Sequence, residues 1–382
     1  MAPATEPAPN TATTGRTAGI GIIGAGNILG RYLKGMARYP SLQVVGCATR
    51  SPERANAAAA EHGIRSFDSV SELLAAPEVD VVLNITTPLA HAETTEAALD
   101  AGKHVYVEKP ITAALPDALR LVATAEQAGL LLGSAPDTFL GSAAQTARRA
   151  VDDGLIGDPI GVAGFITSGR VETWHPDPTF LFQPGGGPVP DMGPYYLTAM
   201  VNLLGPLASV SARGRIGSPT LTVTSPDRRV DSVTVTIHTH VSAVLEFHNG
   251  VIGTLVASFD AWDHHLPRLE VYGTEGTLSI PDPNGLDGDV AVKRHADDEW
   301  RVLPPVLAPF AEPGSMDQFL RGPGVADLVA ALDGAPQRAS AQLACHVLEA
   351  IEGIERSNGN AVPLSTRVER PQPVVPEPAA GG

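Results

Sequence analysis

The chain has 382 residues, a formal net charge of −16 and two cysteines. Its length predicts two domains, and the lack of any apolar run of about 18 residues argues against a membrane span. The acidic balance argues against a nucleic-acid partner, because such binding needs a clustered basic face. Cys47 and Cys345 are too few for a disulfide framework or a zinc cluster, which suits a protein of the reducing cytoplasm.

Both ends of the chain are rich in proline and alanine, and we expect them to be disordered over residues 1–17 and 365–382. The first of these segments lacks the apolar core of a secretory signal.

Residues 18–136 alternate between short apolar runs and stretches typical of helices. Ser51 and Pro52, for example, make a good helix start, with serine as the cap and proline at the first helical position. The alternation predicts an α/β domain with a doubly wound parallel sheet. Its predicted strands cover residues 19–24, 42–48, 79–86, 103–110 and 130–135.

Residues 137–364 show a different pattern and are predicted to form a second α/β domain. A helix is expected over 191–204, and residues 206–303 alternate apolar and polar side chains as half-buried strands do. This pattern predicts an open, mostly antiparallel sheet. Further helices are expected over residues 142–152, 325–333 and 340–356.

A glycine turn follows the first predicted strand and opens a helix, which is the context of a dinucleotide pyrophosphate site. Gly24 and Gly26 would let the backbone approach the phosphates, with Asn27 and Ile28 completing the turn. Leu29 stands where a third glycine is often found, so the fingerprint is incomplete.

The second strand ends at Thr49, Arg50 and Ser51, where NAD enzymes usually carry an acid for the ribose 2′-hydroxyl. A cation with two hydroxyls would instead bind a 2′-phosphate, so NADP is favoured over NAD. The alternative is that Arg50 is a surface cation that stacks on adenine or faces water.

Six stretches together are similar to the glucose–fructose oxidoreductase, inositol dehydrogenase and rhizopine catabolism (Gfo/Idh/MocA) family. They are GIIGAGNI (21–28), NITTPLAH (84–91), VEKP (107–110), DDGLIGDP (152–159), GGGPVPDMGPYY (185–196) and YGTEGTLSI (272–280). The resemblance implies an N-terminal Rossmann domain and hydride transfer between a nicotinamide and a secondary hydroxyl or ketone of a sugar, glycoside or cyclitol. It also implies a homodimer or homotetramer formed through the C-terminal sheet.

The resemblance also assigns cofactor residues. Glu108 and Lys109 belong to the family's Glu-Lys-Pro motif, whose lysine contacts both substrate and cofactor. A lysine at this place can stabilise alkoxide character as the hydride leaves. The family's cofactor-facing segment matches Asn84, Thr86, Pro88 and His91, and His91 is open to two interpretations, a helix cap or a wall of the nicotinamide pocket.

The family often carries Asp-x-Gly-x-His where this chain has Asp191 and, four residues on, Tyr195. The resemblance makes Asp191 a substrate ligand, and a helix N-cap is the alternative. A free tyrosine has a pKa near 10, against about 6.5 for histidine, so Tyr195 would need a cation such as Lys109 to accept a proton at neutral pH. We prefer Tyr195 with Lys109 as the acid/base, then Lys109 alone, then His175, while Tyr195 as a packing residue stays a further alternative.

Trp174 and His175 lie in a proline-rich loop and form either a wall for sugar stacking or a loop anchor. The run Asp263-His264-His265 lacks further ligands at a suitable spacing, so no metal is predicted. Two rival functions stay open: a redox-assisted glycosidase with tightly bound NAD, and a non-catalytic nucleotide-sensing protein.

Overall fold

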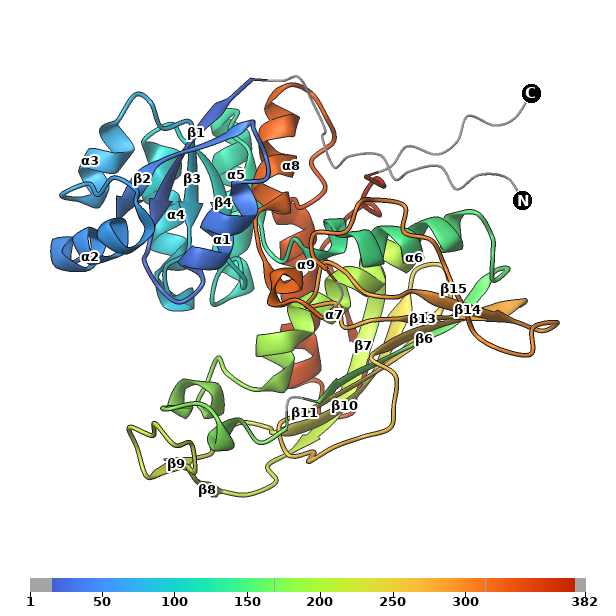
Figure 1. Ribbon diagram of the computed structural model, residues 1–382. Coiled ribbons are helices and arrows are strands. Elements are labelled where there is room, and N and C mark those ends of the chain that lie inside the picture. The colour runs from blue at the N-terminus through green and yellow to red at the C-terminus, as the bar shows by residue number, and fades with distance from the viewer. Residues whose placement is uncertain (1–15, 168, 313, 375–382) are drawn as a thin grey trace, which may run out of the picture. The chain divides into compact units, whose positions relative to one another are not determined.

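The computed structural model describes residues 16–374 apart from 168 and 313, and Figure 1 traces their helices and strands. They form two compact units, the first from residues up to 142 with 306–348 and 374, the second from 143–305 with 349–373. The sequence placed a single boundary near residue 136. The division differs because the late segment 306–348 packs with the first unit.

The first unit contains, within the described residues, a parallel sheet of five strands in the order β2-β1-β3-β4-β5. This confirms the predicted doubly wound sheet. All six residues of β1 are buried, as expected for a strand covered by helices on both faces. The strands are β1 (Ala18–Ile23), β2 (Leu42–Ala48), β3 (Val81–Asn84), β4 (His104–Val107) and β5 (Leu132–Ser134).

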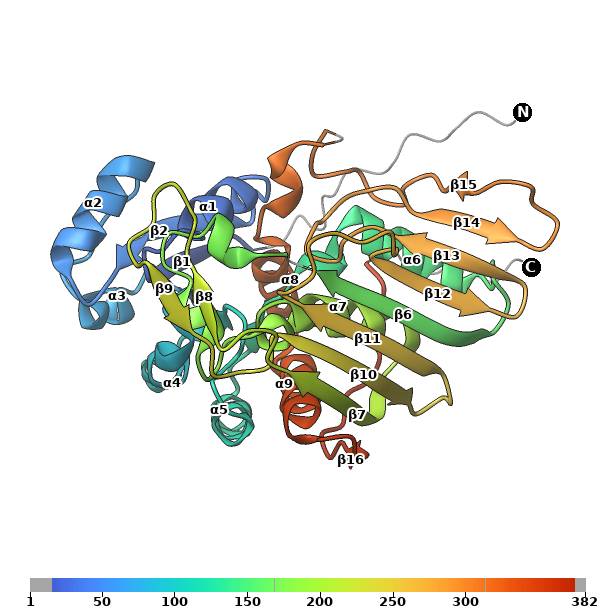
Figure 2. The same ribbon diagram turned by 90° about the horizontal axis from the view of Figure 1, so that it is seen from below.

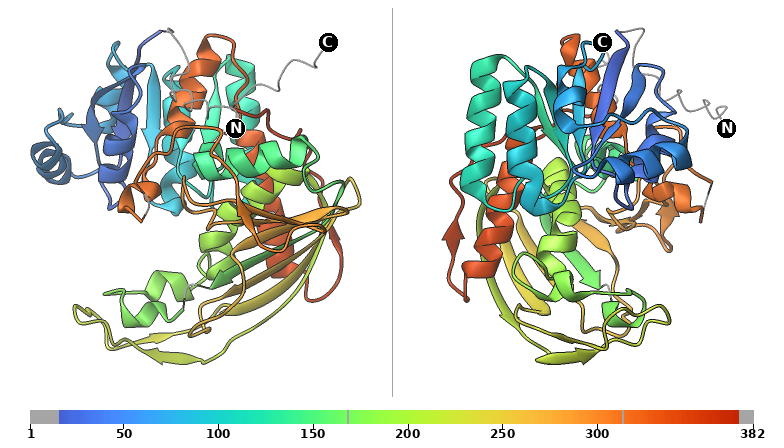
Figure 3. Two further views of the ribbon diagram at one scale, coloured as in Figure 1. Left: turned by 45° about the vertical axis from the view of Figure 1, so that its right-hand side comes forward. Right: turned by 90° about the vertical axis from the view of Figure 1, so that its left-hand side faces the viewer.

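Helices follow the strands as predicted, and α3 (Val70–Ala75) is one that the sequence pattern did not reveal. In the right-hand view of Figure 3, α4 and α5 lie side by side along one face of the sheet. Ser51 caps α2 by accepting from the Arg54 N–H, with Pro52 at the first position as expected. The other helices of the unit are α1 (Leu29–Met36), α2 (Pro52–His62), α4 (His91–Asp100), α5 (Leu115–Ala128) and α8 (Pro323–Leu332).

The second unit contains, in the described part of the chain, a sheet of nine strands in the order β15-β14-β13-β12-β6-β11-β10-β7-β16. Neighbours pair antiparallel except β6 and β11, so the sheet is mixed but mostly antiparallel, as predicted. The strands are β6 (Pro159–Thr167), β7 (Leu207–Arg215), β10 (His240–Phe247), β11 (Ile252–Ser258), β12 (Leu269–Gly273), β13 (Gly276–Ile280), β14 (Ala291–Arg294), β15 (Arg301–Val302) and β16 (Val362–Pro363).

One face of this sheet is covered by α7 (Pro188–Leu204), and Figure 2 shows the strands in front with α7 behind them. The side chains of Tyr196 and Met200 reach Gly164 of β6, where a Cβ would collide with them. On the other face, Val244 of β10 is 52% exposed and Ile252 of β11 is 49% exposed. A small ribbon of β8 (Thr220–Thr222) and β9 (Ser232–Thr234) and helix α6 (Ser142–Asp152) complete the strand-rich part.

The chain ends with α9 (Ala341–Arg356), β16 and an extended segment. Residues 365–374, expected to be part of a disordered end, make defined contacts: the buried Glu349 carboxylate accepts from the backbone and hydroxyl groups of Ser365 and Thr366. The remaining tail predictions, 1–15 and 375–382, lie outside the described residues. Among the helices described, none is long and apolar enough to cross a membrane.

Candidate functional site

The glycine turn after β1 has the geometry of a phosphate-binding loop. Gly24 has φ +114°, and a Cβ there would come within 2.6 Å of the Ile85 carbonyl oxygen. At Gly26, by contrast, a Cβ would meet no atom of the described residues within 4 Å, so this position is open to a ligand. Helix α1 starts without a capping side chain from the described residues. The N–H groups of Leu29 and Arg31 bond to the Gly26 and Ile28 carbonyls, and the positive end of the helix dipole faces the turn, which favours an anion there. Leu29, at the place of a third glycine, is buried in the core.

The residues after β2 use their hydroxyls locally. The Thr49 hydroxyl donates to the Ser51 carbonyl at 2.6 Å, and the Ser51 hydroxyl donates to the Glu53 carboxylate at 2.6 Å. The bond from the Ser51 hydroxyl lowers the pKa of Glu53. Arg50 is the exposed cation of the group, and Glu53 is an acid in the first turn of α2, three residues further along the chain.

Asn84, at the end of β3, is fully buried and serves as an organiser of the following segment. Its amide nitrogen donates to the His91 carbonyl at 3.1 Å and to the Thr95 hydroxyl at 3.0 Å. Its amide oxygen accepts from the Thr86 N–H at 3.2 Å and from the Thr86 hydroxyl at 2.7 Å. These bonds use the whole amide and hold the loop that continues into the short 3₁₀ helix Pro88–Ala90.

His91 is the first residue of α4, and its ring is buried between two loops. Nδ1 lies 2.6 Å from the Pro110 carbonyl oxygen, and Nε2 lies 3.2 Å from the Thr86 carbonyl oxygen. Both partners are acceptors, so a neutral ring donates to only one of them at a time. Burial lowers the pKa of His91, partly opposed by these hydrogen bonds and by Glu108. The ring thus joins the two loops.

Lys109 follows β4 at the carboxyl edge of the parallel sheet, the edge where ligands bind in such folds. The neighbouring Glu108 points inward: one carboxylate oxygen accepts from the Tyr32 hydroxyl at 2.9 Å and the other from the Lys109 N–H at 2.8 Å. Tyr32 was missed because a tyrosine on the buried stripe of α1 is indistinguishable in sequence from an ordinary core residue.

In the second unit, α7 begins at Pro188 with Gly187 as its N-cap, three residues earlier than expected. Asp191 therefore lies inside the first turn, with its N–H bonded to the Gly187 carbonyl at 3.0 Å, and the N-cap alternative for Asp191 was wrong. Tyr195 follows one turn later and is buried. The spacing puts Asp191 and Tyr195 on one face of the helix.

The loop before α7 carries an aromatic cluster. The His175 ring lies edge-on to Trp174, with centroids 5.7 Å apart, and to Phe180, with centroids 5.5 Å apart. Trp174 and Phe180 are 59% and 61% exposed. Nδ1 of His175 accepts from the Asp177 N–H at 3.1 Å, so the neutral ring carries its proton on Nε2.

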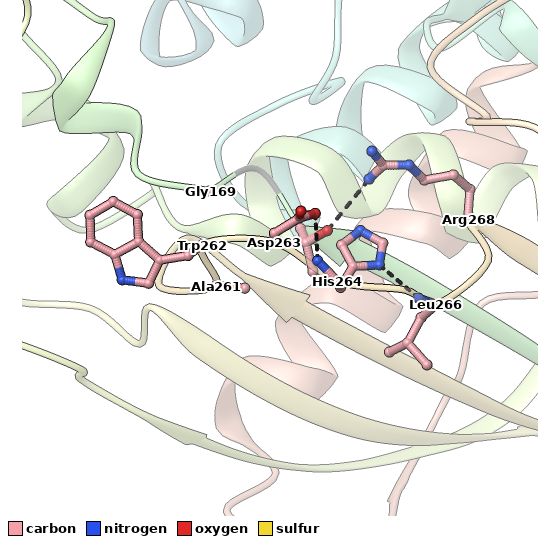
Figure 4. Close-up of a pocket in the computed structure, with 8 residues that line it drawn as sticks. Gly169, Ala261, Trp262, Asp263, His264, Leu266 and Arg268 are labelled. Atoms are coloured by element: carbon pink, nitrogen blue, oxygen red, sulfur yellow. Dashed lines mark hydrogen bonds between the residues drawn. The ribbon is translucent and has the colours of Figure 1, made fainter.

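A pocket of about 370 Å³ opens in the same unit near the end of β6 (Figure 4). In it Arg268 donates to the Thr167 hydroxyl at 3.4 Å. Figure 4 shows the indole of Trp262 pointing away from Arg268. Asp263 accepts from the His264 N–H at 2.7 Å, so this run builds a local turn. Among the described residues, no group of three His, Cys, Asp or Glu side chains converges as metal ligands. The pocket is lined by Thr167, Gly169, Ala261, Trp262, Asp263, His264, Leu266 and Arg268.

The candidate residues thus fall into two sets. The first unit holds the glycine turn, the end of β2, the Asn84–His91 segment and the Lys109 loop. The second unit holds the Trp174–His175 pair with Asp191 and Tyr195.

Comparisons with known proteins agree with this division. A family model described as the oxidoreductase family with an NAD-binding Rossmann fold matches residues 18–135. A second, described as the GFO/IDH/MocA C-terminal domain, matches residues 144–279.

Two relatives are named as reductases of sugar derivatives. The chain is 33% identical over 313 residues to the dTDP-3,4-didehydro-2,6-dideoxy-alpha-D-glucose 3-reductase of Streptomyces violaceoruber, covering 78% of this chain and 86% of that protein. It is 40% identical over 146 residues to the 1,5-anhydro-D-fructose reductase of Ensifer adhaerens, a match that spans 38% of this chain and 44% of the relative.

Solved structures share the fold. A levoglucosan dehydrogenase in complex with NADH and levoglucosan superposes with a TM-score of 0.79 at 20% identity, covering 91% of this chain and 99% of that one. An NAD-binding oxidoreductase from Klebsiella pneumoniae gives a TM-score of 0.77 at 23% identity, covering 92% and 100%.

Proposed function

The chain belongs to the Gfo/Idh/MocA family and is an NAD-binding oxidoreductase that acts on CH–OH groups, and from that premise we propose that its substrate is a sugar, glycoside or cyclitol with a secondary hydroxyl or the corresponding ketone. The observation that supports this proposal most is the position of Lys109, directly after β4 at the carboxyl edge of the NAD-binding sheet. Its loop is held by the bond from the Lys109 N–H to Glu108 and by the bond between His91 and the Pro110 carbonyl. Relatives whose names specify sugar ketone reduction support the same substrate class.

The glycine turn fits a dinucleotide. The open space at Gly26 and the uncapped start of α1 would hold a pyrophosphate at the positive end of the helix dipole. The bound nicotinamide supplies or accepts the hydride. The residues of this chain then bind the substrate oxygen, orient it and move its proton.

We assign the proton transfer to Tyr195 together with Lys109. In the oxidation direction the substrate O–H proton passes to the Tyr195 phenolate while the carbon-bound hydrogen leaves as hydride. The Lys109 ammonium binds the developing alkoxide. Asp191 accepts a hydrogen bond from a neighbouring substrate hydroxyl, and Trp174 and His175 offer an aromatic wall to the sugar ring.

Tyr195→Phe tests this assignment. It keeps the ring and removes the hydroxyl, so kcat is expected to fall by about 100-fold, within the usual range for a lost general acid/base. A pH profile from 6 to 10 that retains nearly full kcat in Tyr195→Phe removes this residue from the chemistry. In that case Lys109→Met and His175→Gln decide between the two remaining candidates.

NADP is the proposed preference. Arg50 is exposed at the end of β2 and no acid stands at residues 49–51. The hydroxyls of Thr49 and Ser51 already bond within the protein, and the Glu53 carboxylate would repel a 2′-phosphate. Both features make the preference for NADP smaller than the sequence predicts. A screen of sugars, inositols and glycosides with both nucleotides, followed at the absorbance of the reduced nicotinamide, gives the substrate and the ratio of kcat/KM for NADP and NAD.

We propose further that copies of the chain associate through the second sheet and that the protein is cytoplasmic. The exposed sheet face with Val244 and Ile252 is the surface through which we expect two copies to associate, as a dimer or tetramer. Val244→Glu should then shift the mass measured by light scattering to that of a monomer. The buried thiols Cys47 and Cys345 suit a cytoplasmic protein.

A further inference from the structure

Glu108 adjoins the reactive lysine, yet its carboxylate is turned into the protein. The residue is 9% exposed. Its two oxygens bind two different parts of the first unit, the hydroxyl of Tyr32 on α1 and the backbone N–H of Lys109. The carboxylate therefore connects the helix of the glycine turn with the lysine loop.

Tyr32 is a dependable donor in this connection. Its side chain is completely buried. Burial and the charge of Glu108 raise the pKa of Tyr32 well above its ordinary value, so the phenol keeps its proton over the working pH range. Hydrogen bonds from neutral donors to a buried carboxylate are among the stronger ones in proteins.

The lysine loop begins where the chain leaves the edge of the parallel sheet after β4. The Glu108 N–H donates to the Asn84 carbonyl at 2.9 Å, which extends the pairing of β3 and β4 by one residue. The next N–H, that of Lys109, has left the sheet and finds the Glu108 carboxylate instead. Outside the loop, the Tyr32 hydroxyl bonds the other oxygen of this carboxylate and holds it in place.

We propose that Tyr32 is a positioning residue for Lys109, acting through the Glu108 carboxylate. This inference rests on the proposed function, because it gives Lys109 its role in hydride transfer. Without the phenol the carboxylate has one unpaired buried oxygen, and the bond that fixes the Lys109 backbone loosens.

Tyr32→Phe removes one oxygen atom and tests the proposal. The expected result is a fall in kcat of about tenfold, the equivalent of one charge-assisted hydrogen bond. The dissociation constant of the reduced nucleotide, measured by its fluorescence, is expected to change less than twofold. Tyr106→Phe is the matched control: Tyr106 is equally buried, two residues before Glu108, and its hydroxyl has no partner within the described residues. It should leave kcat unchanged.

A second measurement does not depend on turnover. The chain contains four lysines, Lys34, Lys103, Lys109 and Lys293, so protein labelled with ¹³C at the lysine ε-carbon gives a spectrum simple enough to assign with Lys109→Arg. Tyr32→Phe is expected to move the Lys109 signal and its titration midpoint and to leave the other three in place. Tyr106→Phe should move none of them.

Glu108→Gln is a second variant that tests the same bond if Tyr32→Phe does not fold. It keeps the side-chain shape and can still accept from the Lys109 N–H, but it no longer presents a charge to Tyr32. The effects of Tyr32→Phe and Glu108→Gln should not add in the double variant, because both act on one bond. Full additivity overturns the proposal, and so does an unchanged Lys109 signal in Tyr32→Phe.

Two outcomes distinguish the role of Tyr32 from that of Lys109. If Lys109→Met keeps full turnover, the proposed function loses its lysine while the spectroscopic result still reports on Tyr32. If Tyr32→Phe and Tyr106→Phe lower kcat equally, Tyr32 has no special connection to Lys109 and the positioning role is refuted.

Discussion

His91 makes the stability of the first unit depend on pH in a direction that its surroundings determine. Folding lowers its pKa, chiefly through burial, so the folded state binds fewer protons at this ring than the unfolded state. The contribution of the neutral ring is complete above the unfolded pKa, about 6.5, and is lost as the pH falls below that value. Stability therefore decreases towards acid.

The magnitude follows from one titrating group. Each pH unit between the unfolded and the folded pKa costs at most about 1.4 kcal/mol of unfolding free energy. Below the folded pKa the loss levels off, because both states are then protonated. The positive charge of Lys109 adds to burial in lowering the pKa, whereas Glu108 and the two carbonyls oppose it.

Urea unfolding of the wild type and of His91→Asn at several pH values between 8 and 5 measures the effect. The asparagine amide nitrogen takes roughly the place of Nδ1 and can still donate to the Pro110 carbonyl, but it does not titrate. Far-UV circular dichroism and amide exchange in β3 and β4 report on the right unit. His104, whose pKa is also lowered, is present in both proteins and cancels in the difference.

The wild type should lose stability relative to His91→Asn as the pH falls below about 6.5. A difference that stays constant, or that favours the wild type at low pH, refutes the reasoning: it would mean that the charged ring, bonded to both carbonyls, is the preferred folded form.

Four further variants test other parts of the molecule. Gly24→Ala forces a side chain into a backbone with φ +114° and against the Ile85 carbonyl, and should lower the unfolding free energy by about 2 kcal/mol. Gly26→Ala should instead keep the melting temperature and weaken nucleotide binding, because the space beside Gly26 is open. Arg50→Ala should raise the KM for NADP at least tenfold more than the KM for NAD, and equal effects would show that Arg50 does not read the 2′-phosphate. The pKa of Glu349 is lowered on folding, because four hydrogen bonds from the C-terminal segment outweigh the opposing effect of burial. The stability that this carboxylate contributes is therefore lost as the pH falls through its folded pKa. In Glu349→Gln that acid loss should disappear from urea titrations.

Local sequence patterns predicted those parts of the fold that depend on neighbours in the chain. The buried strands, the glycine turn and the Ser51 cap each follow from a few adjacent residues. The start of α7 was predicted three residues too late, because glycines and prolines before Asp191 are typical of a loop. Gly187 supplies a positive φ and Pro188 takes the first helical position, so the same residues form a helix start.

Contacts between distant residues were beyond such patterns. Tyr32 and Glu108 are 76 residues apart in the chain. From the sequence alone, Tyr32 is indistinguishable from a core aromatic residue, and Glu108 is only the acid of the Glu-Lys-Pro motif. His91 was assigned a cap or a pocket wall, while its ring holds two loops by their carbonyls. The candidate residues could be named from the sequence, but the bonds that order them required three-dimensional structure.

The late segment that completes the first unit has a consequence for dissecting this protein. Helix α8 lies against β4 and β5, Gly324 meets the ring of Tyr106, and Gly35 of α1 is in contact with the backbone of Arg321. A recombinant fragment cut at residue 142 would leave this flank of the sheet bare and lose the N–H groups of Gly322 and Gly324 that bind the buried Asp137 carboxylate. A nucleotide-binding module taken from this chain for fusion or chimera work therefore needs residues 306–348 joined back to it, for example by circular permutation.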